Sequence, residues 1–254
     1  MKIIFLAGKG EGTLFMYNAL KDNFPIDRVI IEDKMSSMKI IKGRIKRFGY
    51  FKVMNQLLFQ LTVSKLLRFL SKKRIAVLKK HYKLLDEPIS VEKILNVSSV
   101  NDFECIEAIK ELNADVIIVN GTRIISSKVL ESTSALFINT HAGITPQYRG
   151  VHGAYWALVS NDKENCGVTV HKVDKGIDTG EIVKQSTIEI SKPDNFITYP
   201  FHQYGVAIDL MKSTLNDIKN NNFKSFKKEN VKSNLYYHPT FSGYFYNRLF
   251  KGVK

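Results

Sequence analysis

Cysteine is scarce in this sequence, since only Cys105 and Cys166 occur among 254 residues. Small secreted domains with an insufficient hydrophobic core are held together by several disulfides. Two cysteines exclude that class of protein, and two reduced thiols are typical of the cytosol. Hydrophobic residues make up 44% of the chain. That share is enough for an ordinary core in one large domain, or in one domain with a small appendage.

Long hydrophobic runs are also missing. No stretch reaches the length of about 18 uncharged apolar residues that marks a membrane-spanning helix. The apolar run in residues 1–10 is too short for the core of a secretory signal, and it fits a buried first strand better. We therefore expect a cytoplasmic protein without a membrane span, and peripheral contact with the inner face of a membrane stays open.

Acidic residues are absent from one long part of the chain. Residues 34–85 contain fifteen Lys or Arg and no Asp or Glu, whereas the whole chain has a net charge of +14. The rest of the chain is therefore close to neutral. A protein that is basic throughout suggests a nucleic-acid partner. This distribution indicates instead one basic segment inserted into a neutral body, and we expect no nucleic-acid partner.

Short apolar runs alternate with helical patterns through most of the chain. Strands are expected at residues 2–7, 27–31, 94–97, 115–120 and 135–139, and helices at residues 13–20 and 103–112. Continuous apolar strands that alternate with helices predict an α/β fold. We expect a Rossmann-like, mostly parallel twisted sheet with helices on both faces. Residues 169–173 and 181–190 alternate in polarity and are expected to form antiparallel strands at the far edge.

The domain organisation follows from this pattern. Residues 1–200 are expected to form the main domain, with a helical insert at about residues 34–85. Residues 201–254 are expected to form a C-terminal helix and an irregular extension. Within the insert, an i, i+3, i+4 stripe predicts an amphipathic helix, followed by a second helix at residues 66–78. The stripe consists of Tyr50, Val53, Met54, Leu57, Leu58 and Leu61, while Gln56 lies elsewhere on the helical wheel.

Two short blocks, FINTHAGITPQYRG (residues 137–150) and GVTVHKVDKGIDTG (residues 167–180), contain the candidate catalytic residues. Strand side chains alternate, so Asn139 and His141 point to the same face and could converge on one carbonyl. Asp178, in a Gly-rich loop, could orient the imidazole. These three groups can move an acyl unit onto an amine without a covalent intermediate. A covalent route is disfavoured because GxSxG is absent and neither cysteine lies beside a suitable histidine.

Together with the motifs Pro-X-Tyr-Arg-Gly, Gly-Val-Thr-X-His and Asp-Thr-Gly, these residues resemble the formyltransferases that use N10-formyltetrahydrofolate. The resemblance runs from about residue 92 to 190 and more loosely over residues 1–33. It implies N10-formyltetrahydrofolate as co-substrate and direct attack by the substrate amine. Asn139 and His141 would hold the oxyanion, and Asp178 would favour the imidazolium form of His141 and help to accept the amine proton.

Other uses of the histidines were weighed against this interpretation. A metal site of His141, His171 and Asp178 fits by ligand type, but HxH and HxxxH spacings are absent, so no metal is expected. The remaining histidines are expected to be packed or strand-end residues. These are His152, His171, His202 and His238.

The resemblance also implies how the co-substrate binds. The stretch after the fourth strand resembles the segment whose backbone holds the pterin in the family, and the loop of residues 174–180 would close over it. The expected co-substrate residues are Gly121, Thr122, Arg123, Ile124, Ile125, Asp174 and Gly176.

Acceptor-binding candidates lie in the N-terminal Gly-rich loop and after His141. The first loop could hold a phosphate at a helix N-terminus, although a tight strand-to-helix turn explains it better. For Tyr148 and Arg149 the alternative is a packed turn with a surface arginine. The candidates are Gly8, Gly10, Gly143, Thr145, Pro146, Tyr148, Arg149 and Gly150.

The family resembled includes enzymes for glycinamide ribonucleotide, methionyl-tRNA and nucleotide-linked amino sugars. About sixty residues follow the catalytic region, fewer than the β-barrel of the tRNA enzymes needs, and residues 8–14 lack the Ser-Asn pair of the purine enzymes. We therefore expect a nucleotide-linked amino sugar, used for surface polysaccharide, as acceptor. Both other acceptors, and a non-catalytic folate- or nucleotide-binding protein of the same fold, stay open. Neither the sugar, the nucleotide nor the amine position follows from the sequence.

Three roles are compatible with the basic insert. Its apolar stripe could pack on the body or on a second subunit of a homodimer. Residues 39–80 could instead lie on an anionic membrane surface, or the basic side chains could bind the diphosphate of the substrate. The tail aromatics Tyr236 and Tyr237 could stack on a nucleotide base or pack in the core.

Overall fold

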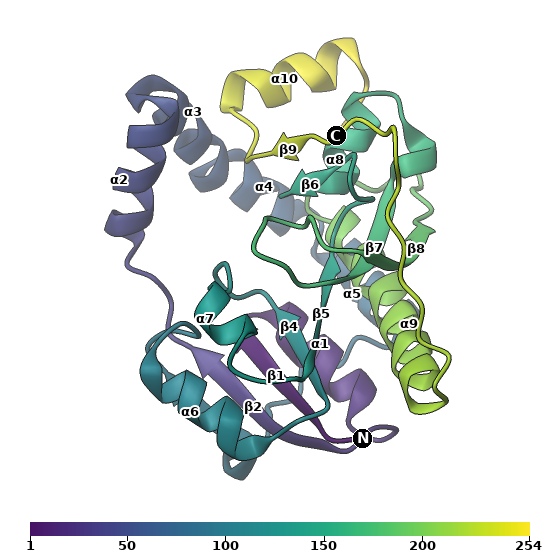
Figure 1. The fold of residues 1–254 in the computed structure, drawn as a ribbon. Coiled ribbons are helices and arrows are strands. Elements are labelled where there is room, and N and C mark those ends of the chain that lie inside the picture. The colour runs from purple at the N-terminus through teal and green to yellow at the C-terminus, as the bar shows by residue number, and fades with distance from the viewer.

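The computed structural model describes residues 1–254 and contains a seven-stranded sheet in the order β3-β2-β1-β4-β5-β7-β8 (Figure 1). Strands β1 to β5 run parallel, and β7 and β8 are antiparallel at one edge. The strands are β1 (Ile3–Gly8), β2 (Ile26–Glu32), β3 (Ile94–Val97), β4 (Val116–Asn120), β5 (Leu136–His141), β7 (Gly167–Lys172) and β8 (Ile182–Thr187). The predicted α/β fold with a mostly parallel sheet is confirmed.

Helices cover both faces of the sheet, which explains the continuous apolar runs in its central strands β1 and β4. Ile3 and Phe5 of β1 face a core shared with α1 (Glu11–Leu20) and α9 (Tyr199–Lys219). Ile4 and Leu6 face a second core beneath α6 (Phe103–Leu112) and α7 (Ser127–Leu130). Helix α9 begins before residue 201 and is buried against β7 and β8, so it belongs to the core of the main body.

The insert between β2 and β3 forms four helices where two were expected. They are α2 (Ser37–Phe48), α3 (Tyr50–Leu61), α4 (Val63–Leu70) and α5 (Lys72–His81). Gly49, which has φ +82°, separates the first two. The prediction of a single helix at residues 66–78 is wrong, because the chain turns at Ser71 between α4 and α5.

The face of α3 that packs on the body differs from the predicted stripe. Val53, Gln56 and Phe59 are buried, and the Phe59 ring lies 5.0 Å from the rings of both Phe196 and Tyr244. Gln56 was placed on the polar side, yet it is 1% exposed. Its amide donates to the His238 carbonyl at 2.6 Å and accepts from Arg44 at 2.7 Å. A satisfied amide can be buried, which periodicity alone does not reveal.

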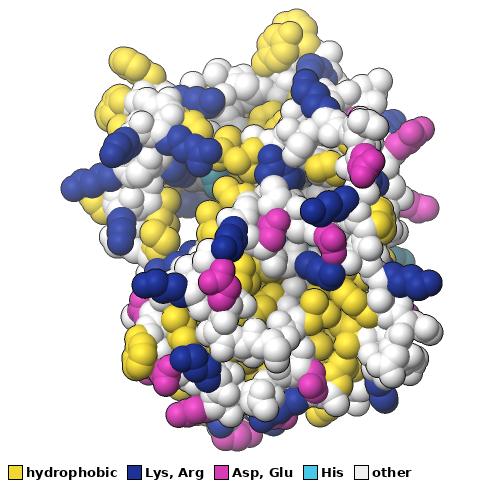
Figure 2. Space-filling view, in the orientation of Figure 1, with side chains coloured by type: hydrophobic (Ala, Val, Ile, Leu, Met, Phe, Trp, Pro, Cys, Tyr) yellow, Lys and Arg dark blue, Asp and Glu magenta, His cyan; other side chains and the backbone are white.

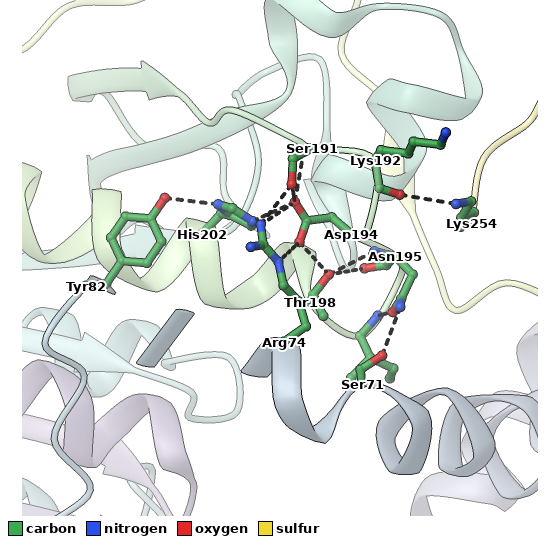
Figure 3. A network of polar contacts seen from close by, with 11 residues as sticks. Ser71, Arg74, Tyr82, Ser191, Lys192, Asp194, Asn195, Thr198, His202 and Lys254 are labelled. Carbon is green, nitrogen blue, oxygen red and sulfur yellow. Dashed lines mark hydrogen bonds and ion pairs between the residues drawn. The ribbon is translucent and has the colours of Figure 1, made fainter. Parts of the chain in front are cut away.

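A polar network also joins the insert to the body (Figure 3). Arg74 of α5 pairs with the fully buried carboxylate of Asp194 at 2.8 Å and 3.0 Å. The same carboxylate accepts hydrogen bonds from the Ser191 and Thr198 hydroxyls. His202 Nε2 also lies 3.0 Å from it, and Tyr82 contacts the Nδ1 of that ring at 2.9 Å. The insert is therefore anchored by apolar packing at α3 and by charge at α5.

The C-terminal segment folds back over the body and is more ordered than the expected irregular extension. Strand β9 (Leu235–Tyr236) pairs with β6 (Arg149–Gly150), and α10 (Phe241–Phe250) packs on α3. Tyr236 stacks between Tyr148 and Trp156, so its ring is used for core packing. The remaining elements are η1 (Val91–Lys93), α8 (Gly153–Val159) and η2 (Lys163–Asn165). None of the helices combines the length and apolar composition required to cross a bilayer.

Candidate active site

A cleft of about 350 Å³ opens where β4 and β5 end. Ligands of open α/β sheets bind beyond the carboxyl ends of the strands, so the position fits a binding site. All three proposed catalytic residues and all seven proposed co-substrate residues line it. The lining consists of Val119, Gly121, Thr122, Arg123, Ile124, Ile125, Asn139, Thr140, His141, Gly150, Val151, His171, Val173, Asp174, Gly176, Ile177 and Asp178.

Asn139 lies directly across from His171, because β5 and β7 are antiparallel neighbours in that register. The Asn139 amide nitrogen is 3.3 Å from His171 Nε2. His171 Nδ1 donates to the Lys172 carbonyl at 2.6 Å, which fixes the ring and turns Nε2 towards Asn139 and Asp178. His171 was expected to be an ordinary packed residue. Its place as the last residue of the Gly-Val-Thr-X-His block was the signal for its presence in the site.

His141 is held at both ring nitrogens. Nδ1 lies 3.3 Å from Asp178 Oδ2, and Nε2 donates to the Tyr148 carbonyl at 2.7 Å. Gly143 makes this arrangement possible. A side chain there would overlap the Tyr148 carbonyl and come within 2.7 Å of His141 Nε2. Gly143 thus shapes the turn beneath the imidazole.

The loop after β7 brings Asp178 to the imidazole. Asp178 adopts a left-handed backbone, φ +52°, which Asp tolerates better than most residues. Its Oδ2 also accepts a hydrogen bond from the Gly150 backbone at 3.0 Å. Asp174 closes the loop by accepting hydrogen bonds from the Gly176 backbone and the Thr179 hydroxyl. A Cβ at Gly180 would collide with the Lys172 carbonyl, so only glycine allows the loop to return to β8.

Burial and neighbouring charges act in opposite directions on the pKa values of His141 and Asp178. Burial lowers the pKa of His141 below 6.5, although Asp178 and the Tyr148 carbonyl partly oppose this. Burial alone would raise the pKa of Asp178, but hydrogen bonding to His171 and attraction to His141 outweigh it and lower that pKa below 3.8. Asp178 does favour the imidazolium as expected, yet burial dominates. At neutral pH the site therefore holds a carboxylate and a neutral imidazole.

The proposed co-substrate loop is anchored from behind. Arg123 pairs with Glu32 at 2.6 Å and also donates to the Asp33 and Ser98 carbonyls. The guanidinium therefore holds the loop against the end of β2, and residues 121–125 line the cleft. Ile125 is buried beneath the loop, whereas Ile124 is largely exposed.

The acceptor candidates occupy several places. Gly150 lines the cleft, and Gly8 lines a neighbouring hollow of about 380 Å³ that meets the cleft at residues 121–123. Gly10 is exposed at the start of α1 and lines neither. The Tyr148 side chain is buried and donates to Asp162 at 2.8 Å. The expected ligand-side position of that side chain is therefore wrong, and Tyr148 reaches the site through its carbonyl.

A further hollow, of about 160 Å³, shares Asp178 with the cleft and is rich in cations. Arg149 donates to the Ile177 carbonyl at 3.0 Å, while its Nε and the buried Thr145 hydroxyl have no protein partner. The cations Lys227 and Lys228 were missed in the sequence because they lie in the tail, far from both motif blocks. The lining is Thr145, Pro146, Arg149, Asp178, Thr179, Gly180, Ile182, Lys227, Lys228 and Ser233. We call this the basic hollow.

Residues 64–199, just over half of the chain, match the family model described as formyl transferase. The chain belongs to the formyl transferase family. The methionyl-tRNA formyltransferase of Kosmotoga olearia is 41% identical over 106 residues, which are 41% of this chain and 34% of that protein. The chain spans about a third to a half of the length of the curated relatives it matches.

Solved structures share the fold of this chain. A sugar N-formyltransferase from a Shewanella species has 15% identity and a TM-score of 0.59, covering 93% of this chain and 76% of that one. An N-formyltransferase from Helicobacter canadensis, in complex with folinic acid and dTDP-3-aminofucose, has 20% identity and a TM-score of 0.54. That match covers 93% of this chain and 71% of that one. The family predicted from the sequence is confirmed by the family model that matches residues 64–199.

The side chains considered for a metal, His141, His171 and Asp178, do meet in the structure. His141 and His171 contact different oxygens of the same Asp178 carboxylate, and each ring uses its second nitrogen on a backbone carbonyl. No group of three His, Cys, Asp or Glu side chains is placed to hold a metal ion. The contacts of the two imidazoles with Asp178 and with backbone carbonyls fit an acid–base and hydrogen-bonding site.

Proposed function

We propose that this formyl transferase moves a formyl group from N10-formyltetrahydrofolate to the amine of a nucleotide-linked amino sugar. The convergence of Asn139, His141 and Asp178 at one end of a cleft supports the formyl transfer. Loops rich in backbone donors and acceptors, at residues 121–125 and 174–178, form the rest of that cleft and suit a pterin. Surface polysaccharide biosynthesis in the cytoplasm would be the setting for such a reaction.

The reaction begins with attack of the neutral amine on the formyl carbon. As the C–N bond forms, the carbonyl oxygen becomes an oxyanion that the Asn139 amide can stabilise. Neutral His141 takes the proton that the amine loses, and Asp178 stabilises the resulting imidazolium. The tetrahedral intermediate then collapses, the bond from carbon to the folate nitrogen breaks, and His141 returns the proton to that nitrogen. The proton can be taken up at His141 Nδ1. The contact of this atom with Asp178, at 3.3 Å, is longer than the Nε2 contact with the Tyr148 carbonyl, so Nδ1 can also contact a ligand atom.

The Asp178→Asn variant is expected to shift the acid limb of the pH profile of kcat/KM to lower pH. Activity needs neutral His141, so it falls as pH drops through the imidazole pKa, which lies below 6.5. Removing the carboxylate removes an attraction that raises this pKa, so the pKa falls further. The plateau rate should fall by about 10²–10⁴, the usual contribution of acid–base catalysis.

Profiles of wild type, Asp178→Asn and Asp174→Asn would check this shift. Asp174 lies in the same loop but does not contact His141, so its variant should keep the wild-type position of the limb. An acid limb that moves up, or stays in place, in the Asp178 variant would contradict the assignment of His141 as proton acceptor.

The basic hollow supports an anionic acceptor. Arg149, Lys227 and Lys228 bring three cations beside Asp178, the residue that the hollow and the cleft share. A diphosphate seated there would leave the attached sugar next to the catalytic residues, and unpartnered Arg149 Nε and Thr145 Oγ1 atoms offer hydrogen bonds. Phosphate recognition by Arg and Lys is common in proteins. The nucleotide sugar in the Helicobacter canadensis complex is an acceptor of this chemical kind.

Methionyl-tRNA is the second candidate acceptor, because the sequence relatives are named for it and one is 41% identical over 106 residues. Glycinamide ribonucleotide, an anionic amine as well, is the third.

The protein should be incubated with N10-formyltetrahydrofolate and dTDP-, UDP- and GDP-linked amino sugars, glycinamide ribonucleotide and methionyl-tRNA, with products detected by mass. A formylated sugar supports the proposal. Formylation of only tRNA or only the ribonucleotide would overturn the acceptor and keep the reaction.

The double variant Lys227→Ala/Lys228→Ala is expected to raise the KM for a nucleotide sugar about 10- to 100-fold. A hydrogen bond to a charged group contributes about 1.5–3 kcal/mol, and about 1.4 kcal/mol is a tenfold change in affinity. The KM for the folate should not change. Lys224→Ala removes an exposed lysine of the same segment that does not line the hollow, and it should behave as wild type. An equal loss in both variants would show that only long-range charge matters.

A further inference from the structure

Helix α3 keeps an apolar stripe on the side away from the body. Phe51, Met54, Leu58 and Leu61 are spaced three, four and three residues apart, so they lie on one face of the helix. All four are exposed, and the Phe51 side chain is 88% exposed. The opposite face, with Val53 and Phe59, is the one that packs on the body. The stripe is therefore not used by the fold.

The neighbours of α3 carry exposed apolar side chains as well. Helix α10, which packs on α3, exposes Leu249 and Phe250 to 75% and 74%. Helix α4, which follows α3, exposes Phe69 and Leu70. Figure 2 shows hydrophobic side chains projecting at the upper edge of the molecule, with Lys and Arg side chains beside them. We call the exposed faces of α3, α4 and α10 the apolar-basic surface.

The charge around this surface has one sign. Of the fifteen cations in residues 34–85, only Arg68, Arg74 and Lys79 form ion pairs. The other twelve have no carboxylate partner within the protein, and no acidic residue occurs in the segment. Helix α10 contributes the further cation Arg248. Unpaired cations next to exposed Phe and Leu side chains are complementary to a layer that is anionic outside and apolar beneath.

We propose that the apolar-basic surface binds the protein peripherally to an anionic lipid bilayer. The aromatic and Leu side chains would enter the boundary between headgroups and acyl chains, while the surrounding Lys and Arg contact lipid phosphates. A second copy of the chain fits less well, because a two-fold contact would place the same unpaired cations opposite one another. No residue of α3, α4 or α10 lines the catalytic cleft, so docking leaves the cleft lining free.

Vesicle flotation tests this proposal without using catalysis. The full-length protein is mixed at low salt with phosphatidylcholine vesicles that contain or lack phosphatidylglycerol. Wild type should float with the anionic vesicles only, and added NaCl should reduce binding because it screens the charges. The variants Phe51→Ser/Leu249→Ser/Phe250→Ser and Lys52→Glu/Lys65→Glu/Arg248→Glu should each bind at least about tenfold more weakly, a loss of about 1.4 kcal/mol.

The matched control is Phe103→Ser, which removes an equally exposed phenylalanine at the start of α6, far from the surface in sequence and outside its helices. It should float like wild type, and thermal unfolding should show that every variant is folded.

Wild type that stays unbound at low salt, or variants that bind as wild type does, would overturn the proposal. A concentration-dependent dimer in light scattering that the Ser variant abolishes, without vesicle binding, would assign the surface to a second copy. Since acceptor formylation is measured separately in solution, failure here would not affect the proposed reaction.

Discussion

The variants His141→Ala and Asn139→Ala should lower kcat by about 10²–10³ each, with little change in either KM. Asn139 supplies a preorganised donor to the developing oxyanion, and loss of one such donor has this magnitude. Loss of the proton acceptor at His141 has a comparable effect. Because both groups act on the same intermediate, the double variant should be far less impaired than the product of the two effects. Initial rates with the identified acceptor check the two single variants and the double variant.

His81→Ala is the matched control, since His81 is exposed at the end of α5 and does not line the cleft. It should keep wild-type kcat, and thermal unfolding should show that the site variants remain folded. If Asn139→Ala and His141→Ala formylate as well as wild type, the mechanism is wrong. If wild type forms no product yet binds the folate, the chain is a non-catalytic binding protein of the same fold.

The sheet was predictable because its strands are buried on both sides. Burial of both faces leaves continuous apolar runs such as residues 116–119, and these can be recognised without knowledge of their neighbours. Asn139 and His141 were predictable for a similar local reason, since alternation along one strand places them together. Asp178 followed from its Gly-rich loop, whose return depends on Gly180.

The parts that were not predictable depend on contacts between distant segments. His171 enters the site only through the pairing of β7 with β5, and Lys227 only through the path of the tail. Gln56 is buried because its amide finds the His238 carbonyl 182 residues away. The net effect on the pKa of His141 depends on how burial competes with Asp178, which the sequence alone cannot weigh.

The largest effect on stability is expected at Asp194. Its carboxylate is completely buried and accepts from Arg74, Ser191 and Thr198, with His202 Nε2 at 3.0 Å. Asp194→Ala leaves the cation of Arg74 without its partner where α5 joins the body. Removing one partner of a buried ion pair costs about 3–5 kcal/mol. The free energy of unfolding from urea titration at pH 7 should fall by that amount, whereas exposed Glu189→Ala should change it by less than about 0.5 kcal/mol.

In acid, the free energies of unfolding of wild type and Asp194→Ala should become similar. Burial alone would raise the pKa of Asp194, but the hydrogen bonds from Arg74, Ser191 and His202 outweigh it and hold that pKa well below 3.8. A carboxyl group whose pKa is depressed by folding stabilises the protein fully above its unfolded pKa, and this contribution is lost as pH falls towards the folded pKa. The difference between wild type and Asp194→Ala should therefore be constant near neutrality and shrink below about pH 4. A difference that is small at pH 7, or that grows in acid, would mean that α3 packing alone holds the insert on the body.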